Sequence, residues 1–182
     1  MEYYFGKVFS MSETPPLGFS EIFKHFLEYK DILKVITVAS CDLSGNPNSA
    51  PKLLVDVVLP NHVYFLDYRY NKTYKNLEVN ERLSLSFMDE RAFQGYRLTG
   101  LCRPLTDAKE LGKARAIWEK RVERYVVDRI VERIKGHYSA RTAEGDLPQD
   151  FVIMDFCATE AAVVKPDRVL LAQYNIMGHP EA

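Results

Sequence analysis

The sequence predicts an α+β fold: an antiparallel β-barrel, closed or split, with about six strands and peripheral α-helices. Two observations lead to this class. Short runs of alternating or β-branched apolar residues follow one another along the chain, and tight turns join most of them. Amphipathic helical patterns lie before the first strand, in the middle of the series and before the last strand. Strands that follow one another through tight turns pair antiparallel, so this order favours a barrel with helices around it.

The composition is typical of one globular domain in a reducing compartment. The 182 residues include 27% charged side chains and carry a formal net charge of −1, so the overall charge attracts neither nucleic acid nor an anionic membrane. No apolar run approaches the roughly 18–20 residues of a membrane span, and the N-terminus lacks the apolar core of a signal peptide. The three cysteines stand apart and are odd in number, which argues against a disulfide framework. We expect a single cytoplasmic domain over residues 1–182.

The first part of the chain supplies a helix and three strands. After an irregular arm over residues 1–17, apolar residues recur at helical spacing and predict a helix over residues 19–29. Three β-rich runs follow, and turns that contain Gly45 and Pro60 separate them. Pro51 lies inside the second run and marks an edge, a bulge or an opening of the sheet, because proline cannot donate a ladder hydrogen bond. The predicted strands cover residues 33–40, 49–58 and 63–67.

The remainder alternates helices and strands. The predicted elements are a short helix over 71–79, strands over 82–89 and 96–105, a long helix from 107 to about 136, and a last strand over 151–164. Gly100 inside a strand suggests a bulge or a close approach of another backbone or of a ligand. The long helix shows one apolar stripe, made of Leu111, Ala114, Ile117, Trp118, Val122, Tyr125, Val126, Ile130 and Ile134. Such stripes usually bury, so core or dimer packing is expected for Trp118 in preference to stacking on a bound ring. A tail over residues 166–182 shows no clear period.

The stretch over residues 68–82 carries the strongest chemical signal. Asn71 is expected to cap the short helix, because its side-chain oxygen can accept hydrogen bonds from the free first-turn amides. A helix N-terminus is partly positive and favours acids, yet Lys72, Thr73 and Lys75 occupy the first turn. Free amides, a hydroxyl and two lysines form a suitable socket for a phosphate group. The alternative is a solvated connector, because a mismatched charge costs only about 0.3–1 kcal/mol.

Four motifs, taken in order, resemble those of the FMN-binding split-barrel superfamily, which contains the pyridoxamine 5′-phosphate oxidase-like proteins and the small FMN-binding proteins. The motifs are the turn Asp42–Pro47 followed by Ala50-Pro51, the strand end Asp67-Tyr68, the segments Lys72–Leu77 and Asn80–Leu85, and the strand Gly95–Gly100. None is diagnostic singly, but the ordered set is fairly specific. The resemblance covers about residues 19–165 and implies a six-stranded split barrel.

By this resemblance the bound anion is the 5′-phosphate of FMN. Lys72 and Thr73 would hold the phosphate, and Asn76 would support the turn. The residues that would border the flavin are Ala50, Pro51, Lys52, Asp67 and Tyr68. In many members the lysine stands three residues before the asparagine, whereas Lys72 stands four before Asn76 and Thr73 fills the other place. Members of the superfamily are homodimers with FMN between the subunits, which implies the same assembly here.

The implied function is an FMN-dependent oxidoreductase that passes electrons between a reduced donor and a small-molecule acceptor. No residue stands out as catalytic, and nothing in the sequence names the substrate. The alternative is a protein without turnover: a flavin electron carrier, a flavin store or a haem-binding split-barrel protein with His62 or His179 as ligand. The four histidines lack metal-ligand spacing, so no metal site is predicted. Bases on the long helix alternate with acids, which is typical of a solvated face and not of a nucleic-acid site.

Overall fold

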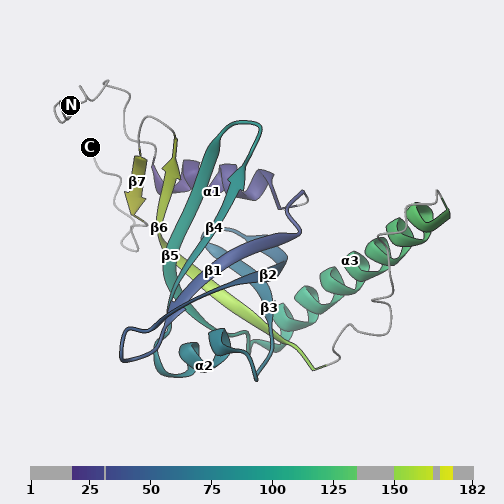
Figure 1. Cartoon of the computed structure of the whole chain (residues 1–182), viewed down its shortest axis with the longest axis horizontal. Coiled ribbons are helices and arrows are strands. Elements are labelled where there is room, and N and C mark those ends of the chain that lie inside the picture. Colours follow the sequence, from purple (N-terminus) through teal and green to yellow (C-terminus); the bar gives the residue numbers. More distant parts are fainter. Residues whose placement is uncertain (1–17, 31, 135–149, 166–168, 174–182) are drawn as a thin grey trace, which may run out of the picture.

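The computed structural model, which describes residues 18–30, 32–134, 150–165 and 169–173, contains an antiparallel β-barrel with three helices (Figure 1). The strands of these residues form one sheet in the order β3-β2-β1-β4-β5-β6-β7, and a further pairing of β3 with β6 closes the first six into a barrel. The strands are β1 Val35–Cys41, β2 Pro47–Val58, β3 His62–Asp67, β4 Arg82–Asp89, β5 Gln94–Pro104, β6 Val152–Val164 and β7 Val169–Gln173. The helices are α1 Phe19–Glu28, α2 Lys72–Val79 and α3 Ala108–Ile134. The predicted fold class is confirmed.

The barrel interior follows from the period of two along each strand. In β1, Ile36 and Val38 are buried while their neighbours are exposed, and in β4 Leu83 and Leu85 repeat the pattern. These side chains form one apolar core with α1, which covers the upper end of the barrel in Figure 1. Helix α1 contributes its fully buried apolar side chains to that core, namely Ile22, Phe23 and Phe26.

Strand β2 changes partner half-way along its length. It pairs with β1 as far as Leu53 and with β3 only from Leu54 onward. Pro51 therefore lies where β2 has a neighbour on one side only, which is where a proline is tolerated in a sheet. Helix α2 contacts β1 and β2 at this open end, and its Tyr74 and Leu77 are buried in the barrel core. The edge position expected for Pro51 is confirmed.

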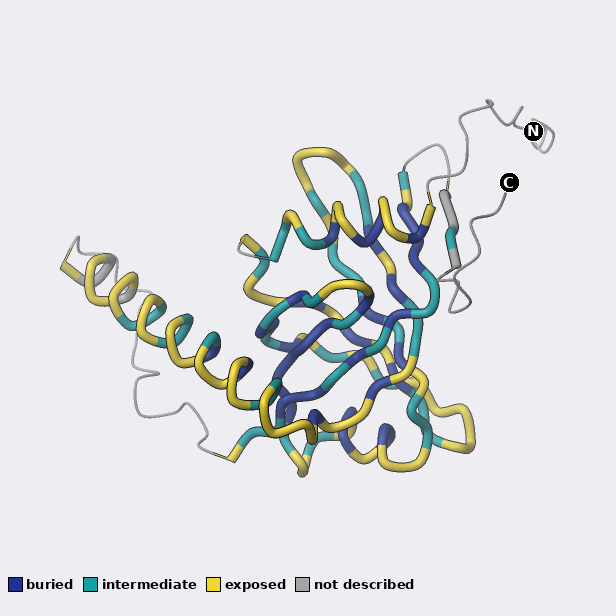
Figure 2. Tube along the Cα trace, turned by 180° about the vertical axis from the view of Figure 1, so that it is seen from behind, coloured by how far each residue is buried: buried dark blue, intermediate teal, exposed yellow. Residues whose placement is uncertain are grey.

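Helix α3 packs on the outer wall of the barrel from its start to about Tyr125. Ala114 and Trp118 are buried there in a second apolar cluster with Tyr64 of β3 and Ile153 of β6, which confirms the core role of Trp118. The predicted single stripe is wrong for the last two turns. Ile130 and Ile134 are 48% and 80% exposed, because the end of the helix runs beyond the barrel into solvent (Figures 1 and 2).

The end of the described chain holds an element that the sequence pattern does not predict. Val169–Gln173 forms β7, which pairs with the C-terminal half of β6, while the N-terminal half of β6 pairs with β3. The 13 residues of β6 are long enough to serve both neighbours. The arm expected over residues 1–17 lies outside the described residues. Among those described, no helix has the length and apolar character needed to cross a membrane.

A close approach of two strands at Gly100 generates the first prediction. A β-bulge between β5 and β6 begins at Thr99 and Gly100, and a Cβ on Gly100 would lie 2.9 Å from the Cα of Ala158 and closer still to the carbonyl oxygen of Cys157. We expect Gly100→Ala to lower the free energy of unfolding by about 1–3 kcal/mol, because backbone atoms must move. Urea unfolding measures the change.

The control for Gly100 is Gly112 in α3, where an added Cβ would meet nothing within 4 Å. Gly112→Ala should stabilise the protein by about 0.5–1 kcal/mol, since alanine loses less backbone entropy in a helix. Unfolding of Gly100→Ala at the wild-type urea concentration would contradict the close approach.

Candidate functional site

The N-terminus of α2 is open, and a neighbouring carboxylate keeps it so. Asn71 takes the N-cap position with extended backbone (φ −72°, ψ 148°), but its side chain makes no capping hydrogen bond. Instead, its Nδ2 donates to Oδ1 of Asp67 at 2.9 Å. The predicted capping by the Asn71 side-chain oxygen is therefore wrong. Without a side-chain cap, the first-turn amides and the partly positive helix end stay available to an anion.

Asp67 is the polar hub beneath this helix end. Its Oδ1 accepts hydrogen bonds from Lys52 Nζ at 2.5 Å, from the backbone amide of Tyr68 at 2.8 Å and from Asn71 Nδ2. The side chains of Lys52 and Asp67 are 5% and 0% exposed, and the second carboxylate oxygen, Oδ2, is buried without a partner. Burying the two charges is costly. The pair thereby fixes the relative position of β2, the end of β3 and the start of α2.

Thr73 and Asn76 face the barrel and are buried. Thr73 Oγ1 accepts from Asn48 Nδ2 at 3.0 Å, and Asn76 Nδ2 donates to Ser40 Oγ at 3.1 Å. These bonds tie α2 to β1 and β2. Contact of the Thr73 hydroxyl with a phosphate remains a prediction. Ser40 and Asn48 were not among the expected site residues, although they lie opposite each other across the β1–β2 hairpin.

The other predicted residues lie nearer the surface. Lys72 is 57% exposed, and its Nζ is 3.8 Å from Oδ2 of Asp42. Tyr68 is half-buried and stacks on Tyr70, with ring centroids 5.5 Å apart. On β2, Pro51 is exposed and points away from the core, while Ala50 lies between Asn48 and Lys52 on the inward face. The structure thus joins Lys52, Asp67 and the start of α2 in one polar cluster, while Lys72 stays largely exposed beside Asp42. The hydrogen bonds of Asn46, with a smaller contribution from Lys72, lower the pKa of Asp42.

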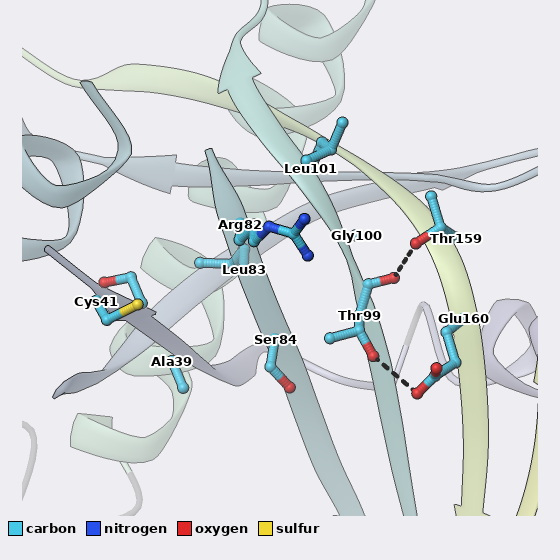
Figure 3. Close-up of a pocket in the computed structure, with 11 residues that line it drawn as sticks. Ala39, Cys41, Arg82, Leu83, Ser84, Thr99, Gly100, Leu101, Thr159 and Glu160 are labelled. Carbon is cyan, nitrogen blue, oxygen red and sulfur yellow. Dashed lines mark hydrogen bonds between the residues drawn. The ribbon is translucent and has the colours of Figure 1, made fainter. Parts of the chain in front are cut away.

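A separate hollow of about 630 Å³ lies on the outer wall of β1, β4, β5 and β6 (Figure 3). Its lining residues are Ala39, Ser40, Cys41, Arg82, Leu83, Ser84, Thr99, Gly100, Leu101, Thr159 and Glu160. The strand register places Ala39, Ser84 and Thr99 in one row, and small side chains in a row leave the space. Thr99 donates to Glu160 Oε1 at 3.2 Å at its edge. None of the eight predicted cofactor residues lines this hollow, whose position depends on register that no local motif specifies.

His62, named above as a haem ligand in the alternative function, already has a partner. Its Nδ1 lies 2.7 Å from Oδ1 of Asp155, and this hydrogen bond raises the pKa of the imidazole. The pair sits where β3 and β6 meet, with both side chains partly exposed. His179 lies outside the described residues. Within the described ranges no group of three or more His, Cys, Asp or Glu side chains could hold a metal ion.

The sequence match decides the family. A family model described as pyridoxamine 5′-phosphate oxidase matches residues 23–165. The chain belongs to the pyridoxamine 5′-phosphate oxidase-like family. This is the FMN-binding split-barrel family to which the ordered motifs point, and the match spans everything from within α1 to the end of β6. No curated protein matches the chain significantly.

Several solved structures are similar to this chain in fold at low sequence identity. A Clostridium acetobutylicum protein related to general stress protein 26 of B. subtilis is 16% identical, with a TM-score of 0.59 over 85% of this chain and 95% of that one. An FMN-binding, pyridoxamine 5′-phosphate oxidase-related protein from Nostoc punctiforme is 12% identical, with a TM-score of 0.60 over 93% and 96%. A heme-binding protein from Mycobacterium smegmatis is 16% identical, with a TM-score of 0.57 over 84% and 57%.

The buried Lys52–Asp67 pair generates the second prediction. Asp67→Leu removes the carboxylate and leaves the Lys52 charge buried without a partner, so the free energy of unfolding should fall by about 3–5 kcal/mol. In the double variant Lys52→Met/Asp67→Leu the unpaired charge is gone, and much of that loss should be recovered. Urea unfolding of the wild type and both variants measures these differences. A loss below about 1 kcal/mol for Asp67→Leu, the size expected of an exposed ion pair, would contradict a buried pair.

Proposed function

We propose that this protein binds FMN with the 5′-phosphate at the N-terminus of α2 and acts as an oxidoreductase on a small molecule. The observation that carries the proposal is the α2 N-terminus itself: it has no side-chain cap and carries the exposed Lys72. Membership of the pyridoxamine 5′-phosphate oxidase-like family supports FMN as the anion. So does the similarity in fold to a Nostoc protein described as FMN-binding.

The chemistry of FMN matches the features around this helix end. A dianionic phosphate suits first-turn amides and a lysine that is free to move. The outward edge of β2 near Pro51 offers backbone for a polar chain, and the stacked Tyr68 and Tyr70 offer an aromatic surface beside it. Lys52 and Asp67 act as positioning residues, because both are buried and already bonded to each other. In this proposal FMN lies where two copies of the chain meet.

Bound FMN would supply the electron transfer, while the chain binds and orients the cofactor. The donor would be a reduced small molecule and the acceptor a second one. A flavin carrier would bind FMN in the same way but would show no catalytic turnover. NAD(P)H oxidation assays with candidate acceptors therefore separate a carrier from an oxidoreductase. Haem binding is the other alternative, since a relative of the same fold is described as heme-binding. A Soret band on haem titration with no response to FMN would favour it over the flavin.

The third prediction concerns Lys72. We expect the purified protein to show a flavin absorption spectrum, or to acquire one on addition of FMN with a rise in melting temperature. Lys72→Ala should weaken FMN binding by more than tenfold, because a charge-assisted hydrogen bond contributes about 1.5–3 kcal/mol. Flavin fluorescence titration measures the dissociation constant.

The matched control is Lys109→Ala, which removes an exposed lysine near the start of α3 and should leave FMN affinity unchanged. A protein that saturating FMN neither binds to nor stabilises would overturn the proposed function. Equal weakening by both substitutions would show a general effect of charge and no socket at α2.

A further inference from the structure

A second hollow, of about 250 Å³, lies between α3 and the barrel, and most of the side chains that line it are basic. Two of these bases come from the segment between α1 and β1. Three come from α3, where the lining residues recur at i, i+3, i+4, i+7 and i+8, which is one face of a helix. We call this space the basic hollow, and its bases are Lys30, Lys34, Lys120, Arg121 and Arg124.

The two bases on the barrel side each have a carboxylate near them. Lys30 Nζ lies 3.6 Å from Oδ1 of Asp56, and Lys34 Nζ lies 4.0 Å from Oδ2 of Asp128. The ammonium group of Lys34 also lies 5.0 Å from the centroid of the Tyr125 ring. The side chains of Lys34 and Asp128 are both more than half exposed, and exposed ion pairs contribute little free energy. A bound anion can therefore replace or share such a contact.

The three bases on α3 have no carboxylate partner among the described residues. The guanidinium of Arg121 is half-buried and donates to three backbone carbonyl oxygens, with the shortest bond, of 2.7 Å, to that of Lys30. Lys120 and Arg124 are exposed, and their side chains form no ion pair or hydrogen bond within the described chain. Like charges one turn apart on a helix repel each other. The basic hollow thus gathers positive charge in a chain whose formal net charge is −1.

This arrangement has the features of an anion site. A concave surface lined by one sign of charge concentrates the electric field and attracts counter-ions. Guanidinium and ammonium groups bind phosphate oxygens through charge-assisted hydrogen bonds. The carbonyl bonds of Arg121 hold one guanidinium in place, so little side-chain entropy is lost when it meets a ligand. The volume lies just below the roughly 300–1,000 Å³ of sites for drug-sized molecules, so a compact ligand fits.

We propose that the basic hollow binds a small anion with two or more linked phosphate groups. Bases approach from both the barrel and α3, and a chain of phosphates can meet both sides at once. The half-buried Tyr125 offers a wall for an organic group attached to the phosphates. Because Asp56 and Asp128 lie beside the bases, a compact anion suits the hollow better than a long nucleic acid. The hollow shares no residue with the α2 site, so this is a second anion site, independent of the proposed function.

Calorimetric titration of the full chain with inorganic triphosphate tests the proposal. We expect saturable binding that weakens as the salt concentration rises. The variant Lys120→Gln/Arg124→Gln should weaken the tightest triphosphate site at least tenfold, because it removes charge-assisted contacts. Both side chains are exposed and unbonded in the described part of the chain, so the fold should stay intact, which circular dichroism checks.

The matched control is Lys109→Gln/Arg115→Gln. It removes two positive charges from exposed positions on the same helix, away from the hollow, and should leave the triphosphate affinity unchanged. Equal weakening by the two double variants would overturn the proposal, as would a wild-type protein that binds no triphosphate. A parallel titration with ATP identifies the source of the phosphates. Equal affinities support a site for the phosphate chain alone, and tighter binding of ATP supports an organic triphosphate.

Lys72→Ala separates this site from the one at α2. It should leave the affinity of the tightest triphosphate site unchanged, and Lys120→Gln/Arg124→Gln should leave FMN affinity unchanged. Loss of triphosphate binding in Lys72→Ala would place the anion at α2 and overturn the basic hollow as its site. Failure of FMN to bind contradicts the α2 site alone and leaves the triphosphate result standing, so the two proposals fail separately.

Discussion

The buried pair of Lys52 and Asp67 is the constraint around which the proposed site is arranged. Two charges at one end of the barrel interior are expensive to desolvate, and the structure compensates by converging three donors on one oxygen of Asp67. One of the donors is the side chain of Asn71 at the N-cap of α2. With its Nδ2 turned to Asp67, Asn71 makes no side-chain capping hydrogen bond, and the helix end stays open. A buried charge pair and an uncapped helix are two aspects of one arrangement.

This arrangement separates residues that hold the helix from residues that can meet a ligand. Thr73 and Asn76 are buried and bonded to β1 and β2, so they anchor α2 from inside. Lys72, in the same first turn, is largely exposed. A helix end that is anchored from inside and carries one exposed lysine suits an anion, because the amides need no reorganisation. Pro51 lies on the part of β2 that pairs with β1 alone, beyond the end of the β2–β3 pairing at Leu54.

The barrel could be predicted from the sequence because its strands alternate and follow one another, so local pattern and long-range pairing agree. Lys72 could also be predicted as a candidate ligand, because it is a basic residue in a first helical turn that favours acids. The ion pair of Lys52 with Asp67 could not be predicted, because it depends on two strands meeting at the barrel end. The hollow beside Thr99 depends in the same way on register across β1, β4 and β5. Apolar residues recur at helical spacing along the whole of α3, but burial stops where the helix extends past the barrel.

A comparison of FMN with riboflavin tests most directly whether the open end of α2 binds a phosphate. The two flavins differ only in the 5′-phosphate, so the ring and the ribityl chain cancel in the comparison. Flavin fluorescence titrations of the wild-type protein should give an FMN affinity at least tenfold higher than that for riboflavin, the effect of one charge-assisted contact of about 1.5–3 kcal/mol. Equal affinities for the two flavins would contradict the account.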